Sequence, residues 1–166
     1  MKNGLWPNLF IGWDNKESET INTLKLIPVF KNFTKKEFLE LEKLVHHRNF
    51  SENEFIFKNN APGEGMYIVM KGSIKISIGE GKNEKILANL QEGDFFGELA
   101  LFDDEPRSAN AISLSESKLI GFFTPDLLAL KDRNPVITNK ILFNLGQILG
   151  ERLRQTNSLL LDQQKK

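Results

Sequence analysis

The fold class is decided by residues 66–78, which read MYIVMKGSIKISI. Within them, positions 74–78 alternate isoleucine with lysine and serine, and this period of two is typical of a β-strand with one buried face. The apolar run 66–70 comes just before, and Lys71-Gly72 between the two runs is typical of the turn that joins neighbouring strands. The stretch therefore predicts two short antiparallel strands.

Short apolar runs separated by turn residues continue on both sides of this stretch. Glycine-rich turns such as PGEG at 62–65 and GEG at 79–81 are what short antiparallel strands need at their ends. Many short strands with frequent turn signals are typical of a mainly β fold, built as an antiparallel β-roll that resembles a jelly roll. The strands are predicted at 46–50, 54–57, 66–70, 73–78, 84–90, 109–114 and 117–123.

Helical patterns flank the predicted roll on both sides. Thr34 with Glu37 three residues later is typical of a capping box, which marks the start of the second of two N-terminal helices. After the strands, Pro125 and Pro135 stand at the first positions of a short helix and then of a long one. We expect an N-terminal arm at 1–17 and one domain at 18–166, made of helices 18–45, a β-roll 46–123 and C-terminal helices 124–161.

The composition excludes several classes of function. The 166 residues carry 22 Lys and Arg against 22 Asp and Glu, so there is no net positive field to hold a nucleic-acid backbone. The chain has no cysteine, and its longest apolar runs, such as 119–123, are far below the ~20 residues that span a bilayer. We therefore expect a cytoplasmic protein whose partners include neither nucleic acid nor membrane.

The histidine content argues against metal and enzyme chemistry. A β-barrel of this kind could be a metal-dependent cupin enzyme, but such a site needs two or more clustered histidines together with a carboxylate. The chain has only His46 and His47, and neighbouring residues of a strand point to opposite faces. We expect both histidines to be structural, no bound metal and no catalytic activity.

One segment, 95–111, fits neither a plain strand nor a plain turn and reads FFGELALFDDEPRSANA. The residues after Gly97 can form one helical turn whose first amides would point at an anion. The guanidinium of Arg107 can bind two phosphate oxygens, and the carboxylate of Glu98 can accept a hydrogen bond from a ribose hydroxyl. The pattern favours a pocket for a phosphodiester joined to a sugar. Taken singly, the same two residues would be interpreted as an exposed turn, with the arginine paired to an acidic residue at 103–105.

The segment resembles the phosphate-binding cassette of the cyclic nucleotide-binding domain family, with FGELAL at 96–101 and, after a short spacer, PRSA at 106–109. This family includes the catabolite activator protein and the protein kinase A regulatory subunit. The resemblance covers residues 24–161. It departs from the family pattern near Asn60, where the family has a glycine, in a turn that we expect to lie away from the cassette. MYIV at 66–69 with KGS at 71–73 resembles the family's hairpin between two strands, and GDF at 93–95 resembles its entry to the cassette.

The resemblance implies a role for individual residues of the cassette. Glu98 would bind the ribose hydroxyl, and Arg107 with Ser108 would hold the cyclic phosphate. Ile76 and Leu87 would line the wall beside the base or sugar. The other residues implied in the site are Phe96, Gly97, Leu99, Ala100 and Ala109.

The long C-terminal helix carries a second part of the resemblance. In the catabolite activator protein a threonine–serine pair on this helix reaches the adenine, and RLRQTN at 152–157 resembles that stretch, with asparagine in place of serine. Thr156 and Asn157 are therefore predicted either to contact the base or to be ordinary polar positions of an amphipathic helix. The leucine stripe from Leu142 to Leu160 is predicted to pack on the roll or on a second copy of the chain, as a homodimer.

Together these patterns predict a non-catalytic sensor or regulatory subunit that binds a cyclic nucleotide and signals to a partner protein. cAMP is favoured over cGMP as the ligand, because the family's cGMP binders often carry threonine after the arginine and this chain has Ser108. A DNA-binding helix-turn-helix is not expected, because only five residues follow Leu161. The alternative is a relative that binds no nucleotide and serves as a protein-interaction module.

Overall fold

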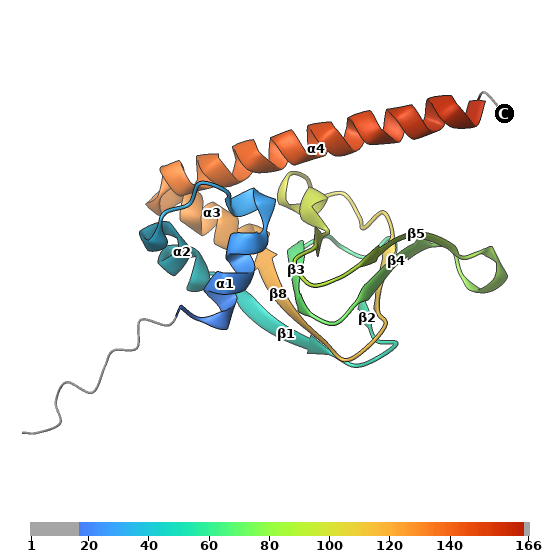
Figure 1. The fold of residues 1–166 in the computed structure, drawn as a ribbon, viewed down its shortest axis with the longest axis horizontal. Coiled ribbons are helices and arrows are strands. Elements are labelled where there is room, and N and C mark those ends of the chain that lie inside the picture. The colour runs from blue at the N-terminus through green and yellow to red at the C-terminus, as the bar shows by residue number, and fades with distance from the viewer. Residues whose placement is uncertain (1–16, 165–166) are drawn as a thin grey trace, which may run out of the picture.

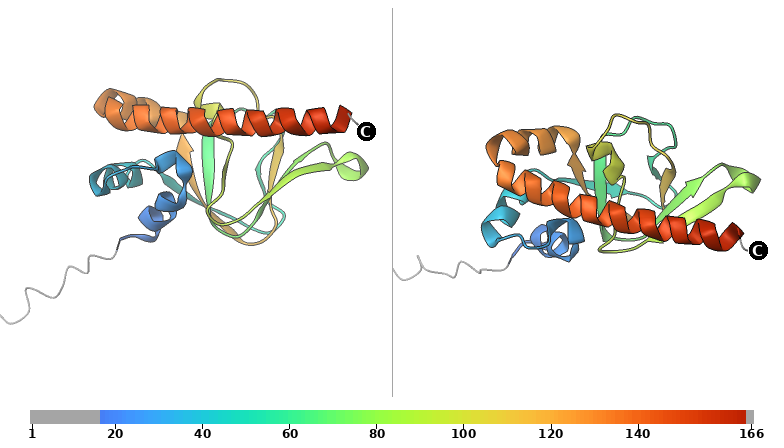
Figure 2. Two further views of the ribbon diagram at one scale, coloured as in Figure 1. Left: turned by 45° about the horizontal axis from the view of Figure 1, so that its top comes forward. Right: turned by 90° about the horizontal axis from the view of Figure 1, so that it is seen from above.

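Two antiparallel sheets and four α-helices make up the part of the chain that the computed structural model describes, residues 17–164 (Figure 1). The predicted arm, 1–17, lies outside the described residues apart from Glu17. The sheets form a roll, the helices gather at one end of it, and the last helix runs along it (Figure 2).

The roll consists of two four-stranded sheets in which every pair of strands is antiparallel. One sheet has the order β1-β8-β3-β6 and the other the order β2-β7-β4-β5. The predicted mainly β fold is confirmed, and each predicted strand is present with its ends within one residue. The short strand β6 was not predicted. The strands are β1 (His46–Phe50), β2 (Phe55–Phe57), β3 (Gly65–Lys71), β4 (Ile74–Ile78), β5 (Lys85–Leu90), β6 (Phe95–Phe96), β7 (Asn110–Ser113) and β8 (Ser117–Phe123).

Strand β3 joins the two halves of the hydrophobic core. Its Met66 and Ile68 pack against the buried residues of the helices, whereas Tyr67 and Val69 point into the roll. A strand that is covered on both faces needs no polar positions, which explains its uninterrupted apolar sequence. Each fully buried aliphatic side chain contributes roughly 1.5–3 kcal/mol to folding, so this strand fixes the roll against the helices.

Helix α2 begins where its capping residues predict, whereas α3 begins at Thr124, so that Pro125 is its second residue and not its first as predicted. Thr34 Oγ1 accepts a hydrogen bond from the amide of Glu37, and the Glu37 carboxylate accepts one from the amide of Thr34, so the capping box is confirmed. No helix within residues 17–164 is long and apolar enough to cross a membrane. The helices are α1 (Glu19–Leu26), α2 (Lys35–Glu42), α3 (Thr124–Arg133) and α4 (Pro135–Gln164), with short 3₁₀ helices η1 (Pro28–Phe30), η2 (Gly81–Asn83) and η3 (Glu98–Leu101).

Helix α4 is anchored by its first half. Asn134 caps it by accepting a hydrogen bond from the amide of Ile137 at 3.3 Å, and Pro135 occupies the first position, where no amide is needed. Ile137, Ile141 and Leu145 are buried in the core that the helices share with β3. From 151 to 162 every residue is exposed, so the second half of α4 extends beyond the core (Figure 1).

Candidate functional site

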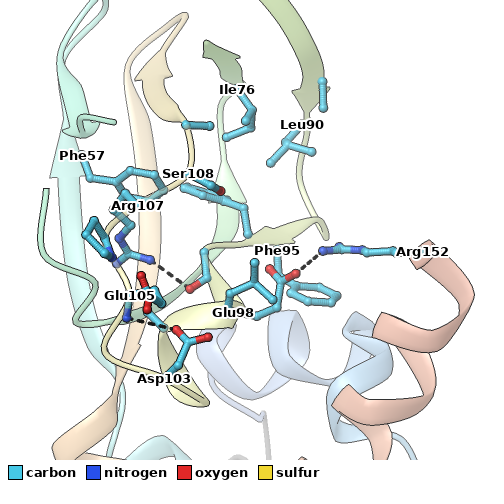
Figure 3. A pocket seen from close by; sticks show the side chains of 17 residues that line it. Phe57, Ile76, Leu90, Phe95, Glu98, Asp103, Glu105, Arg107, Ser108 and Arg152 are labelled. Carbon is cyan, nitrogen blue, oxygen red and sulfur yellow. Dashed lines mark hydrogen bonds and ion pairs between the residues drawn. The ribbon is translucent and has the colours of Figure 1, made fainter. Parts of the chain in front are cut away.

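A cavity of about 470 Å³ opens between the roll and α4. Strands β2, β4, β5 and β6, the segment 97–109 and Arg152 of α4 supply its lining (Figure 3). Ile76 and Leu90 form an apolar wall, and the charged side chains of Glu98 and Arg107 stand apart from it. The cavity therefore has one apolar side and one charged side.

Gly97 sets the geometry of the charged side. Its φ of 73° is in the left-handed region, which glycine adopts without strain, and the chain enters η3 directly after it. A Cβ added at this position would lie 2.7 Å from Nη1 of Arg107 and 3.3 Å from the carbonyl oxygen of Gly65. Only glycine leaves room for the guanidinium here.

Arg107 is buried, with 7% of its surface exposed. Its Nη1 donates to the carbonyl of Gly97 at 2.9 Å and its Nη2 to the carbonyl of Gly65 at 2.8 Å. Within residues 17–164 no carboxylate forms an ion pair with this guanidinium, so the exposed-turn interpretation, with pairing to 103–105, is wrong. Its buried Nε has no hydrogen-bond partner in the described part of the chain. Burial lowers the pKa of Arg107, yet a guanidinium remains charged at neutral pH.

The turn at Asn60 lies against the cassette and not away from it as predicted. The amide of Asn60 donates to the carbonyl of Arg107 at 2.8 Å, and the amide of Arg107 donates to the carbonyl of Ala61 at 2.8 Å. Asn60 has a φ of 63°, a left-handed conformation that asparagine tolerates better than most residues. Asn60 therefore adopts a left-handed backbone conformation, which glycine also adopts without strain.

Glu98 is tied to α4 by an ion pair with Arg152, whose Nη1 donates to Oε1 of the carboxylate (Figure 3). The Glu98 side chain is buried, and Arg152 also lies over the ring of Phe95, with 4.8 Å from Cζ to the ring centroid. Arg152 was not among the predicted site residues. Its signal in the sequence is its position four residues before Thr156, which places both on one face of a helix.

Most of the predicted site residues meet at the cavity, and three do not. Leu87 is the extra residue of a β-bulge between the pairs Ile76–Ala88 and Ser77–Ile86, and it points away from the cavity to solvent. The predicted residues that line the cavity are Ile76, Phe96, Gly97, Glu98, Leu99, Ala100, Arg107, Ser108 and Ala109, and lining residues that sequence reasoning missed include Phe57, Ala88, Leu90, Phe95 and Arg152.

Thr156 and Asn157 lie outside the lining and are exposed. Thr156 is one turn beyond Arg152 on the same face of α4, and its hydroxyl donates to the carbonyl of Arg152 at 2.9 Å. Asn157 is a further 100° around the helix and turns away from that face. Both alternatives for these residues, base contact or plain polar position, stay predictions.

The two histidines contact neighbouring helices. His46 Nε2 lies 3.0 Å from Oδ2 of Asp126, and His47 Nε2 lies 3.1 Å from Oγ1 of Thr20. Within residues 17–164, no three His, Asp or Glu side chains are arranged to hold a metal ion. Both histidines link β1 to helices that flank the roll.

A β-roll that holds a buried arginine and a buried glutamate around one cavity, with a long helix beside it, is the architecture of a cyclic nucleotide-binding domain. The sequence model described as "Cyclic nucleotide-binding domain" matches residues 47–134, more than half of the chain. The chain therefore belongs to this family.

Three similar proteins illustrate the family. The chain is 30% identical over 135 residues to a cyclic AMP receptor protein of Thermus thermophilus, covering 81% of this chain and 61% of the relative. It is 29% identical over 99 residues to a cGMP-dependent protein kinase of Drosophila melanogaster, covering 58% of this chain and 11% of the kinase. The N-terminal domain of a transcriptional regulator from Streptomyces coelicolor has a similar structure, with a TM-score of 0.72, 27% identity, and coverage of 83% of this chain and 94% of that domain. The chain thus spans less than two thirds of the length of either curated relative.

Proposed function

We propose that this chain binds a cyclic nucleotide in the cavity, with cAMP preferred over cGMP, and that it acts as a non-catalytic sensor which signals to a partner protein. The proposal rests chiefly on Arg107, a buried cation with an unpartnered Nε that forms no ion pair with a carboxylate of the described residues. Burying a charge without a counterion is costly, and a ligand anion in the cavity would supply the missing partner.

A cyclic nucleotide matches the polar groups of the cavity one by one. Its phosphodiester carries a single negative charge, which suits the one guanidinium of Arg107 with the hydroxyl of Ser108 beside it. The cyclic phosphate occupies the 3′ and 5′ oxygens, so the 2′-hydroxyl is the free ribose donor, and Glu98 can only accept. The base would then lie toward the apolar wall of Ile76 and Leu90.

The preference for cAMP depends on the residue that follows Arg107. The relatives named above include a cyclic AMP receptor protein and a cGMP-dependent kinase, so family membership alone is compatible with either base. Ser108 after the arginine favours cAMP, since the family's cGMP binders often have threonine there.

Titration calorimetry with cAMP, cGMP and 5′-AMP tests the proposal. We expect saturable binding of one cAMP per chain, weaker binding of cGMP, and the weakest binding of 5′-AMP, whose second phosphate charge finds no second unpaired guanidinium because Arg152 is paired with Glu98. A ligand that binds only the native state also raises the melting temperature. If neither cyclic nucleotide binds or raises it, the chain is a protein-interaction module instead.

Replacing Gly97 with alanine is expected to displace Arg107 and weaken cAMP binding. The new Cβ would lie 2.7 Å from Nη1 of Arg107. The backbone φ of 73° at position 97 would add a strain of about 1–2 kcal/mol for a residue other than glycine. We expect the dissociation constant, measured by calorimetry, to rise roughly tenfold because the guanidinium can no longer fork onto the phosphate.

Gly93→Ala is the matched control for this change. Gly93 also has a left-handed φ, of 87°, but a Cβ added there meets nothing within 4 Å. This variant carries the backbone strain without the contact, so its affinity for cAMP should match that of the wild type. Equal losses of affinity in the two variants would mean that strain alone, and not the position of Arg107, explains the effect.

The ion pair between Glu98 and Arg152 offers a route for the signal. A ribose hydroxyl that binds Glu98 would share or replace the contact that holds α4 to η3. A ligand can shift a conformational equilibrium only through such a difference in contacts between two states. We propose that the position of α4 relative to the roll is what a partner protein recognises.

We also propose that two copies of the chain form a homodimer through α4. Phe143, Leu153 and Leu160 are 68%, 61% and 54% exposed, and each is a large apolar side chain without cover. They belong to one stripe in which spacings of three and four alternate, as in a two-stranded coiled coil. The stripe is Phe143, Gly146, Gly150, Leu153, Asn157 and Leu160.

Leu153→Glu is expected to weaken the dimer. A carboxylate in the middle of this stripe would be buried without a partner, so the dimer dissociation constant should rise roughly tenfold or more in sedimentation equilibrium. Leu128→Glu is the control, because Leu128 is 53% exposed on α3 and lies off the stripe. A wild-type chain that stays monomeric in concentrated solution would rule the dimer out.

A further inference from the structure

Phe57 lies against the guanidinium of Arg107 at the end of β2. Cζ of Arg107 is 4.2 Å from the centroid of the Phe57 ring, and Figure 3 shows the ring beside the guanidinium on the cavity wall. The ring is held from behind by Phe96 and Tyr67, with centroid separations of 5.8 and 6.2 Å. Its place is therefore fixed by the interior of the roll.

The groups that contact the guanidinium of Arg107 directly are uncharged, and the carboxylates of Glu64 and Glu98 act on it only from beyond ion-pair distance. Two carbonyl oxygens accept hydrogen bonds from it, the ring of Phe57 lies over it, and within residues 17–164 no carboxylate forms an ion pair with it. A carboxylate in place of the ring would attract the cation strongly but would also neutralise it. The negative face of an aromatic ring attracts a cation and carries no net charge, so the positive charge stays available to an anion.

We infer that Phe57 is a positioning residue for Arg107, which holds the guanidinium buried and oriented in the absence of ligand without cancelling its charge. The inference rests on the proposed function and concerns how the phosphate-binding group is kept in place. Without the ring, Arg107 would occupy its binding position in a smaller fraction of molecules. The apparent dissociation constant rises in inverse proportion to that fraction.

Progressive fluorination of the Phe57 ring tests this inference. Each fluorine makes the ring face less negative while the size and packing of the side chain change little. We expect the dissociation constant for cAMP to rise stepwise from phenylalanine to trifluorophenylalanine at position 57, by roughly threefold to tenfold in total. Phe57→Leu should weaken binding at least as much, and Phe57→Tyr should retain it.

Phe55 on the same strand provides a matched control. Its ring also lies near a cation, Nζ of Lys58 at 4.8 Å, but it does not line the cavity. Fluorination of Phe55 should leave the affinity for cAMP unchanged. A loss of similar size at both positions would mean that fluorine acts through the strand and would overturn the inference.

A stability measurement without nucleotide separates this inference from the proposed function. In the wild-type background, trifluorophenylalanine at 57 should raise the unfolding equilibrium constant by roughly threefold relative to phenylalanine. In an Arg107→Met background the same change should have no such effect, because the cation is gone. If fluorination costs the same stability in both backgrounds, the ring does not hold the guanidinium, whether or not the chain binds a cyclic nucleotide.

Discussion

Replacing Arg107 with alanine is expected to weaken cAMP binding about a hundredfold or more, the largest effect of any single change in this chain. The phosphate would lose a buried guanidinium that forms no ion pair with a carboxylate of the described residues and whose Nε has no hydrogen-bond partner there. Truncating one partner of a buried charge pair costs about 2–5 kcal/mol, most of it because the other charge stays dehydrated. Titration calorimetry measures the change directly.

Two further variants identify the cause of that loss. Arg107→Lys keeps the charge but not the planar fork, so its affinity should fall between those of alanine and the wild type. Arg48→Ala is the matched control, since Arg48 also lies over an aromatic ring, with Cζ 5.7 Å from the centroid of Phe123, but is exposed and outside the cavity. If the Arg107→Ala variant folds and binds cAMP with unchanged affinity, the phosphate does not bind at Arg107.

The unliganded Arg107→Ala protein should remain folded. The change removes the donors to the carbonyls of Gly97 and Gly65, each hydrogen bond contributing about 0.5–1.5 kcal/mol or somewhat more to a charged donor. It also removes a buried cation without a counterion, and the relief of that desolvation offsets part of the loss. A melting temperature close to that of the wild type would show that the residue serves the ligand more than the fold.

The strands of the roll could be predicted from the sequence because each one carries its own signal. The alternation at 74–78 and the turns around it depend only on local residues, and the same is true of the capping box at Thr34 and Glu37. Strand β6 has no such signal. Its two residues are extended only because they pair with Tyr67 and Ile68 of β3, a contact between distant parts of the chain.

The cassette could be recognised from its pattern, whereas the rest of the site depends on tertiary structure. Leu87 was expected on the wall, but a β-bulge puts Ala88 and Leu90 there instead, and a bulge has no local sequence code in this strand. Arg152 and Phe57 reach the cavity from α4 and β2, which the fold brings next to the cassette. For Arg152 the sequence signal is its spacing of four residues from Thr156, whereas nothing in the local sequence of β2 indicates that Phe57 will face the cavity.

Glu98→Ala is expected to weaken cAMP binding roughly thirtyfold, because a hydrogen bond to a charged group contributes about 1.5–3 kcal/mol. The wild type should distinguish cAMP from 2′-deoxy-cAMP by a similar factor, since the deoxy ligand leaves the buried carboxylate without its ribose donor. The alanine variant should bind the two ligands with nearly equal affinity. Calorimetry on both proteins with both ligands gives the coupling between the carboxylate and the hydroxyl.

Arg152→Ala distinguishes a ribose role of Glu98 from a purely structural one. Suppose that the carboxylate of Glu98 served only to hold α4 through its ion pair with Arg152. Glu98→Ala and Arg152→Ala would then reduce the affinity for cAMP equally, and both variants would bind cAMP and 2′-deoxy-cAMP with the same affinity. If the carboxylate binds ribose, the Arg152→Ala variant should still prefer cAMP over its deoxy analogue. The change should then destabilise only the unliganded protein, because the buried carboxylate of Glu98 loses its counterion there. In the variant, the 2′-hydroxyl of the ligand would replace part of the hydrogen bonding that Arg152 gives to the Glu98 carboxylate. Binding of cAMP should therefore raise the melting temperature of Arg152→Ala by more than it raises that of the wild type.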